Sequence, residues 1–158
     1  MASTYTPLGI ELMQTGENAG TWGSKTNANL NLVEQLAGGF KQVSIAGTAQ
    51  TTDLTVATDK VKFILPYAFT LTGISASVTT APTGATLVVD VNEGGTSIMT
   101  TNKIVIDVSE TSTATAATAP TLTDSSLASG SLITIDVDQI GSTVAGAGLK
   151  VYLTGYQS

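Results

Sequence analysis

Residues 131–140, SLITIDVDQI, alternate apolar and polar side chains, and this alternation decides the fold. Ile133, Ile135 and Val137 fall on one side of an extended chain, and Thr134 and two aspartates fall on the other. Successive side chains of a β-strand point to opposite faces of a sheet, so the pattern is typical of a strand with one buried face. The same alternation recurs in ATLVVDVNE at 85–93 and in NKIVIDVSE at 102–110, where Val108 continues the apolar side. Together these segments predict an antiparallel sheet with one solvated side.

Period-two patterning continues through most of the chain after residue 40. We expect short strands, separated by glycine and proline turns, at 42–46, 53–57, 60–66, 69–79, 85–92, 96–99, 103–109, 131–139 and 148–155. The segment 110–130 is rich in alanine and threonine, and predicts a long exposed loop with a short helical turn opened by Asp124. The predicted fold class is all-β, an antiparallel β-sandwich or jelly-roll-like domain.

The chain changes character near residue 40. Residues 1–23 hold several glycines and a proline around one short apolar patch, which predicts an irregular or extended arm. Residues 24–37 predict the one helix, with Ser24, Thr26 or Asn27 as its cap and Gly38-Gly39 as its end. We therefore expect two domains, an N-terminal arm and helix at 1–40 and a β-sandwich at 41–158.

Composition argues against several classes of function. The 158 residues contain no His, Cys or Arg, and only 11% of them are charged. Catalysis by histidine or a thiol and zinc binding by Cys and His are thereby excluded, and we expect no enzyme activity and no cofactor. Six lysines against twelve carboxylates argue against nucleic acid as a partner. No apolar run approaches the roughly 20 residues of a membrane helix, so we expect no membrane insertion.

Three strands carry an aspartate at an equivalent position, namely Asp90, Asp107 and Asp136. One interpretation is a calcium site, because carboxylates are hard oxygen ligands. The alternative, which we favour, is that these aspartates mark the solvent face and discourage edge pairing. The sequence leaves the choice open.

The first quarter of the chain holds the candidate interface residues. Trp22, the only tryptophan, stands in GTWG and is either a hydrophobic staple for the helix or an anchor in a protein interface. Asn27, Asn29 and Asn31 alternate along the helix, although asparagine is a weak helix former, which suggests hydrogen bonds to another molecule or simple surface polarity. The predicted attachment and interface residues are Leu8, Ile10, Leu12, Met13, Trp22, Asn27, Asn29, Leu30, Val33 and Leu36.

Residues 8–40, with ELM-x-TGE, GTWG and T-N-x-N-L-x-L-V-E, resemble the N-terminal segment of virion appendage proteins of tailed bacteriophages, especially the tail-fibre-like proteins of marine phages. The remainder resembles a phage β module through F-x-x-P-Y-A-F-T-L-T-G, V-D-V-N-E-G-G-T-S-I and I-D-V-D-Q-I-G-S-T. The resemblance implies a virion protein, assembled in the host cytoplasm. It also implies a homo-oligomer, with a trimer as the leading state, and tail, collar or capsid proteins as partners.

On this basis the sequence predicts a non-enzymatic structural protein. Its N-terminal segment would anchor a small fibre-like appendage, and its sandwich would face outward for host adsorption through a cell-surface glycan or protein. One alternative is a capsid decoration, cement or head-fibre protein that stabilises the shell. A second alternative is a carbohydrate-binding β module. Such a module would need a cluster of exposed aromatic residues, and we expect most aromatic residues of this chain in strand-core positions.

Overall fold

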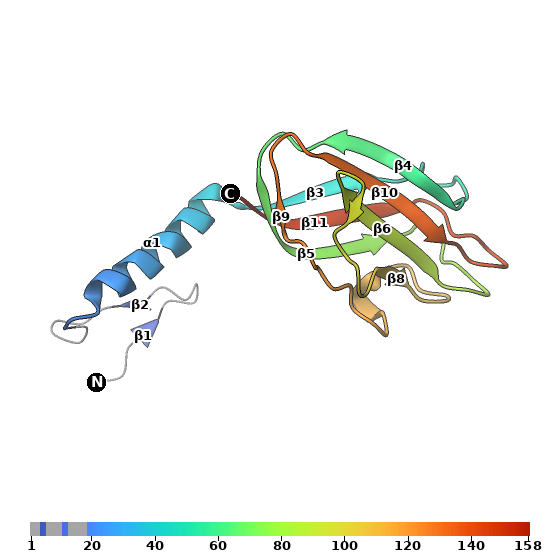
Figure 1. Cartoon of the computed structure of the whole chain (residues 1–158). Helices are drawn as coiled ribbons and strands as arrows, with labels where there is room; N and C mark the ends of the chain where they lie inside the picture. Colours follow the sequence, from blue (N-terminus) through green and yellow to red (C-terminus); the bar gives the residue numbers. More distant parts are fainter. Residues whose placement is uncertain (1–3, 6–10, 13–18) are drawn as a thin grey trace. The chain divides into compact units, whose positions relative to one another are not determined.

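The computed structural model describes residues 4–5, 11–12 and 19–158 (Figure 1). The chain divides into two compact units, Met1–Phe40 and Lys41–Ser158. This division falls where the sequence changes from a helical to a two-residue period. Among the described residues, no helix is long and apolar enough to cross a membrane.

In the first unit, residues 4–5, 11–12 and 19–40 form one short pair of strands and one helix. Strand β1 (Thr4–Tyr5) pairs antiparallel with β2 (Glu11–Leu12). Helix α1 spans Trp22–Gly38. The arm therefore includes a paired element that its sequence did not predict.

Helix α1 begins two residues earlier than predicted. The Thr21 carbonyl accepts hydrogen bonds from the Lys25 amide at 3.1 Å and from the Ser24 hydroxyl at 2.7 Å. Ser24 therefore lies inside the first turn, and the prediction that Ser24, Thr26 or Asn27 caps the helix was wrong. The predicted end is confirmed, because Gly39 follows the helix with a positive φ of 71°.

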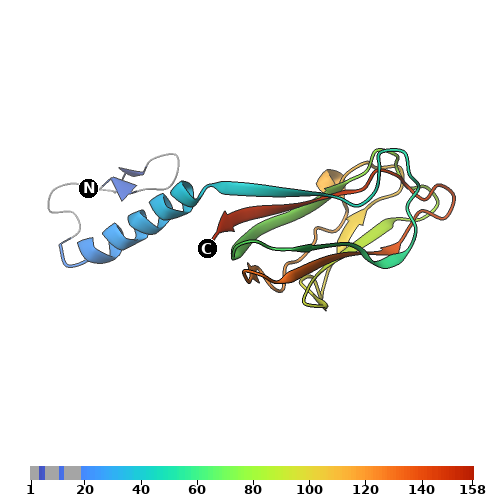
Figure 2. The same cartoon turned by 90° about the horizontal axis from the view of Figure 1, so that it is seen from above.

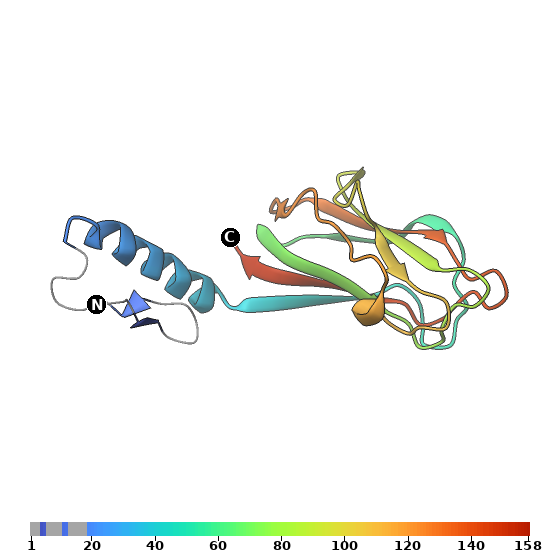
Figure 3. The same cartoon turned by 90° about the horizontal axis from the view of Figure 1, so that it is seen from below.

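The second unit is an antiparallel β-sandwich of two facing sheets (Figures 1 and 2). One sheet has the order β4-β10-β6-β7, and β8 also pairs with β6. Its strands are β4 (Ala57–Ile64), β10 (Leu132–Gln139), β6 (Leu87–Glu93), β7 (Thr96–Ser97) and β8 (Ile104–Ile106). The other sheet has the order β3-β11-β5-β9, and its first three strands lie side by side in Figure 3. Its strands are β3 (Phe40–Ala46), β11 (Lys150–Gln157), β5 (Phe69–Ser77) and β9 (Ser126–Leu127).

Alternating side chains build the core as the sequence predicted. The predicted inward residues of β6, β8 and β10 are at most 1% exposed, and they are Leu87, Val89, Val91, Ile104, Ile106, Ile133, Ile135 and Val137. Val108 does not join them, because β8 ends at Ile106 and the side chain of Val108 is 44% exposed. The β5 and β11 strands contribute the facing half of the core, including Phe69 and Leu153, both fully buried.

Two predicted segments differ from the structure in kind, whereas other predicted strands differ only in their bounds. Residues 53–57 are not a strand, because Asp53 makes only an isolated bridge to Ala147 and β4 begins at Ala57. The segment 110–130 is not simply an exposed loop, because it contains β9 and a 3₁₀ turn at Thr113–Thr115. Ser112 caps that turn, so the prediction of a helical turn opened by Asp124 was wrong.

Strand β4 forms a free edge of its sheet within the described structure, and its geometry resists further pairing. The register of β4 and β10 shifts between Ile135 and Val137, and Asp59 has a positive φ of 54°. Lys62 on the same strand pairs with Asp59 at 2.7 Å. A bulge and charged side chains are the usual means by which sheets avoid edge-to-edge association.

Candidate interaction surface

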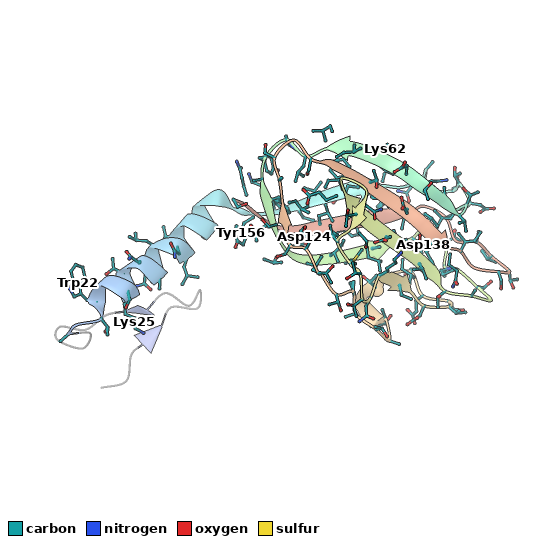
Figure 4. All side chains as sticks on the ribbon, viewed as in Figure 1. Trp22, Lys25, Lys62, Asp124, Asp138 and Tyr156 are labelled. Atoms are coloured by element: carbon teal, nitrogen blue, oxygen red, sulfur yellow. The ribbon has the colours of Figure 1, made fainter. Side chains whose placement is uncertain are left out.

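The exposed apolar residues of α1 form the first candidate surface. Trp22 is 66% exposed, Leu30 58% and Val33 47%. These three positions fall within about 80° of one another around a helix of 3.6 residues per turn. Figure 4 shows Trp22 at the start of the helix, with its side chain pointing away from the helix axis. We call Trp22, Leu30 and Val33 the helix stripe.

The asparagines occupy different positions relative to the stripe. Asn27 is exposed, whereas Asn29 is half-buried and already engaged in an interaction. Asn29 lies about 20° from Trp22 around the helix, on the side away from Val33 and Leu30, so its amide borders the apolar stripe. Hydrogen bonds from these amides to another molecule stay a prediction.

Several predicted interface residues lie outside what the structure describes. Leu8, Ile10 and Met13 are among the undescribed residues. Leu12 belongs to β2 and Leu36 to α1, but the structure does not describe their side chains. Their role in an interface stays a prediction.

The three aspartates weighed as calcium ligands do not form one group. Asp90 and Asp136 are direct cross-strand neighbours on the outward face of β6 and β10. Asp107 instead follows β8 and accepts a hydrogen bond from the Ala117 amide at 2.8 Å. Within the described residues, no three Asp or Glu side chains are placed to hold a metal ion.

A lysine neutralises the acidic side chains near Asp90. Lys103 Nζ lies 2.8 Å from Asp90 Oδ2 and 2.7 Å from Asp138 Oδ2. Asp90 is 4% exposed, and its Oδ1 also accepts hydrogen bonds from the Ser97 hydroxyl and the Val91 amide. The hydrogen bonds with Asp138 and Asp90 raise the pKa of Lys103 above the usual range of a lysine, so this side chain is a fixed cation.

The neighbouring aspartate is held by neutral donors. Asp136 accepts a hydrogen bond from the Asp59 amide at 2.7 Å and another from the Asn92 side chain at 3.1 Å. Asn92 and Thr134 are also buried, although both point to the outward face of the sheet. The carboxylates of Asp90 and Asp136 already bind donors within the protein. This favours a structural role for the aspartates over metal binding.

The structure also shows an outward aromatic pair that the sequence analysis missed. Tyr152 and Tyr156 on β11 alternate with the buried Val151, Leu153 and Gly155, and both tyrosines are half-buried on the outer face of the sheet. The sequence predicted most aromatic residues in strand-core positions, and for this pair the prediction was wrong. Alternation in KVYLTGYQ carries the signal, since the inward valine and leucine fix the tyrosines to the opposite face.

A scan against protein-family models, a search of curated proteins and a search of solved structures found no match to this chain.

Proposed function

We propose that this chain is a non-enzymatic structural protein of a tailed-phage virion. Its N-terminal unit would attach it to the particle, and its sandwich would face outward. The observation that supports this proposal most directly is the helix stripe. A tryptophan, a leucine and a valine, each about half exposed or more, share one face of a helix that has few charged residues.

A surface of this kind indicates a partner. Tryptophan is enriched among the residues that dominate protein interfaces. Leu30 and Val33, three residues apart, are neighbours on the helix surface. An isolated helix of this length is also marginal in water, so packing against another molecule would stabilise it. The motifs at residues 8–40 that resemble phage appendage proteins include the stripe, and they favour a virion protein or a sister copy of the chain as that partner.

The sandwich suits a display role. Its core is buried between the two sheets, and Lys103 on its surface is paired with Asp90 and Asp138. Five aliphatic residues are also exposed on the sandwich, namely Val56, Ile64, Val108, Leu132 and Val144. The side chains required for the commonest acid–base and thiol catalysis are missing from the sequence, which contains no His and no Cys. This composition fits a protein whose function is binding and presentation.

The test is incorporation into particles. In the phage that encodes the chain, the gene is disrupted, and wild-type or variant protein is supplied from a plasmid. We expect the wild-type protein in purified particles, and we expect Trp22→Ala with Leu30→Ala to reduce its amount at least tenfold. Alanine keeps the helix intact because it has the highest helix propensity. Val56→Ala is the matched control, because Val56 is 59% exposed on the sandwich while Leu30 is 58% exposed on the helix.

Quantitative mass spectrometry of the particles separates the two virion roles. A copy number close to that of tail or collar proteins supports the appendage, and one close to that of the major capsid protein supports decoration of the shell. Absence of the wild-type protein from purified particles would overturn the proposal. Unchanged incorporation of the double variant would overturn the role of the helix stripe.

A further inference from the structure

Strand β3 is where the chain enters the sandwich, and it lies beside the last strand, β11. Among the described strands of its sheet, its only neighbour is β11, which ends at Gln157. The Lys41 ammonium donates a hydrogen bond to the Gln157 side chain at 2.8 Å, and the Gly47 amide donates one to the Leu149 carbonyl at 2.7 Å. The two strands therefore run antiparallel, and the C-terminus lies beside the start of β3 (Figures 1 and 2).

The start of β3 is tied to two separate parts of the sandwich. Besides the hydrogen bond to Gln157, Lys41 Nζ lies over the Tyr67 ring, 4.8 Å from its centre. A lysine in this position is attracted by the negative face of the ring. Tyr67 stands between β4 and β5 and packs against the core. Lys41 thus links the first turn of the strand pair to the end of β11 and to the β4–β5 connection.

The far end of β3 is held mainly through the backbone. The Leu149 amide donates to the Thr48 hydroxyl at 3.2 Å, which adds to the bond from the Gly47 amide. A Cβ atom added to Gly47 would lie 2.9 Å from the buried Leu149 side chain, so the two segments are in close contact. Between the two ends, Val43 and Ile45 pack into the core. Both ends of β3 are therefore fastened to the sandwich.

Strand β11 is itself held firmly. It lies between β3 and β5, and all eight of its residues have partners on β5. Val151 and Leu153 of β11 are fully buried. A force that enters the sandwich through β3 therefore passes to β11, and from β11 to β5 and the core.

The direction of a pull decides how the bonds between β3 and β11 break. Hydrogen bonds of an antiparallel pair are perpendicular to the strands. A pull between the start of β3 and the end of β11, which lie together, acts along these bonds and opens them one after another. A pull between the start of β3 and residues 140–149, which lead into β11 at the opposite end, acts across the bonds and loads all of them at once. The strand pair resists this second direction better.

We propose that β3, with the contacts at its two ends, is a load-bearing strap that carries force from the N-terminal unit into the sandwich. The inference rests on the proposed function, because attachment through the N-terminal unit would make Lys41 the point where load enters the sandwich. A partner held by residues 47–56 or 140–149, at the far end of β3, would complete the load path. The resistance itself belongs to the purified chain. A chain that enters particles but unfolds equally easily in both directions leaves the structural role intact and removes only this inference.

The experiment pulls single full-length molecules by two pairs of points. One handle is always at an N-terminal tag, and the other is bonded to a single cysteine at Val144→Cys or at Ser158→Cys. The chain contains no cysteine of its own, so each attachment point is unique. The N-terminal unit extends in both geometries and does not affect the comparison. We expect the sandwich to unfold at about twice the force or more when it is pulled from residue 144, because bonds loaded together resist better than bonds broken in sequence.

Lys41→Met tests the contact at the start of the strap, because methionine keeps an apolar stem and lacks the ammonium. In the pull between the two termini this contact opens first, so unfolding at constant force should become about fivefold faster. Lys60→Met is the matched control, because Lys60 Nζ also donates to a neutral partner, the Thr55 hydroxyl at 2.9 Å, but lies on β4 in the other sheet. It should leave that rate unchanged.

Equal unfolding forces in the two directions, or a lower force in the pull from residue 144, would overturn the proposal. Equal unfolding rates of Lys41→Met and Lys60→Met would also overturn it, since the strap would then be unsecured at the point where load enters. Circular dichroism before pulling confirms that each variant is folded.

Discussion

Lys103 is the residue on which the polar network of the β4-β10-β6 sheet depends most. Its ammonium lies between Asp90 and Asp138, while Asp90 is almost fully buried. A buried carboxylate without a cation suffers a large desolvation penalty, so the lysine offsets that penalty. Asp90 also lies directly opposite Asp136, a like charge whose repulsion the network must balance.

We predict that Lys103→Met lowers the free energy of unfolding by about 1–2 kcal/mol. Removing one partner of a fully buried pair costs about 3–5 kcal/mol, and solvent screening reduces the loss here because 37% of the Lys103 side chain is exposed. Chemical denaturation at neutral pH measures the difference. Lys62→Met is the control: Lys62 and its partner Asp59 are 52% and 45% exposed, so this variant should lose no more than about 0.5 kcal/mol. Equal losses in both variants would contradict the interpretation.

The pH dependence of this pair follows from the direction of the pKa shift. The folded state raises the pKa of Lys103, so the stabilisation is complete below the pKa of an unfolded lysine, about 10.4, and declines at higher pH. The stability difference between wild type and Lys103→Met should therefore stay constant from neutral pH to about pH 9 and shrink above about pH 10.4. A difference that grows in alkaline solution would show that Lys103 is not the stabilising cation.

At the scale of elements, two glycines in the β5–β11 pair have opposite roles. A Cβ on Gly155 would collide with the backbone carbonyl of Thr70, whereas a Cβ on Gly73 would meet open space. Gly155 lies where the register of the two strands shifts, next to Thr154. The absence of a side chain at Gly155 therefore permits the close approach of the strands, while Gly73 has no such steric role.

We predict that Gly155→Ala destabilises the sandwich by about 2–4 kcal/mol, because the backbone must move to accept the methyl group. Gly73→Ala should be neutral or stabilising by up to about 1 kcal/mol, since it reduces the entropy of the unfolded chain without strain. Thermal and chemical denaturation of the two variants provide the measurement. Similar stabilities would mean that the β11 backbone moves freely at this point.

Sequence alone predicted the strands that alternate large apolar side chains, and it failed where pairing depends on a partner far away in the chain. In 53–57, Leu54 and Val56 would share one face of a strand, yet Leu54 is buried and Val56 is 59% exposed. The Leu54 amide instead donates to the Gly146 carbonyl in a loop contact. Strand β9 is only two residues long and gives no periodic signal. The placement of Tyr152 opposite Ser75 and of Tyr156 opposite Thr70 depends on the register of β5 against β11, which no local pattern specifies.

At the scale of the whole molecule, the described core belongs entirely to the sandwich. Its residues extend from Val43 to Leu153, and none comes from α1. The sandwich therefore contains the hydrophobic contacts that stabilise it. Helix α1 exposes its stripe, and an isolated helix of such length is close to the limit of stability in water. Stability is thus unevenly distributed along the chain, and the less stable unit carries the stripe proposed to bind a partner.

This distribution predicts that a fragment of residues 40–158, which retains all of β3, folds by itself. Its free energy of unfolding should equal that of the full chain within about 1 kcal/mol, because the deletion removes no residue of the described core. A fragment that begins at Gly47 is the control, because it lacks β3 and with it Val43 and Ile45, and it should lose at least about 2 kcal/mol. Chemical denaturation followed by circular dichroism compares the three proteins. A clear loss of stability in the longer fragment would show that the N-terminal unit supports the sandwich, and the separation between an attachment unit and a display unit would then be wrong.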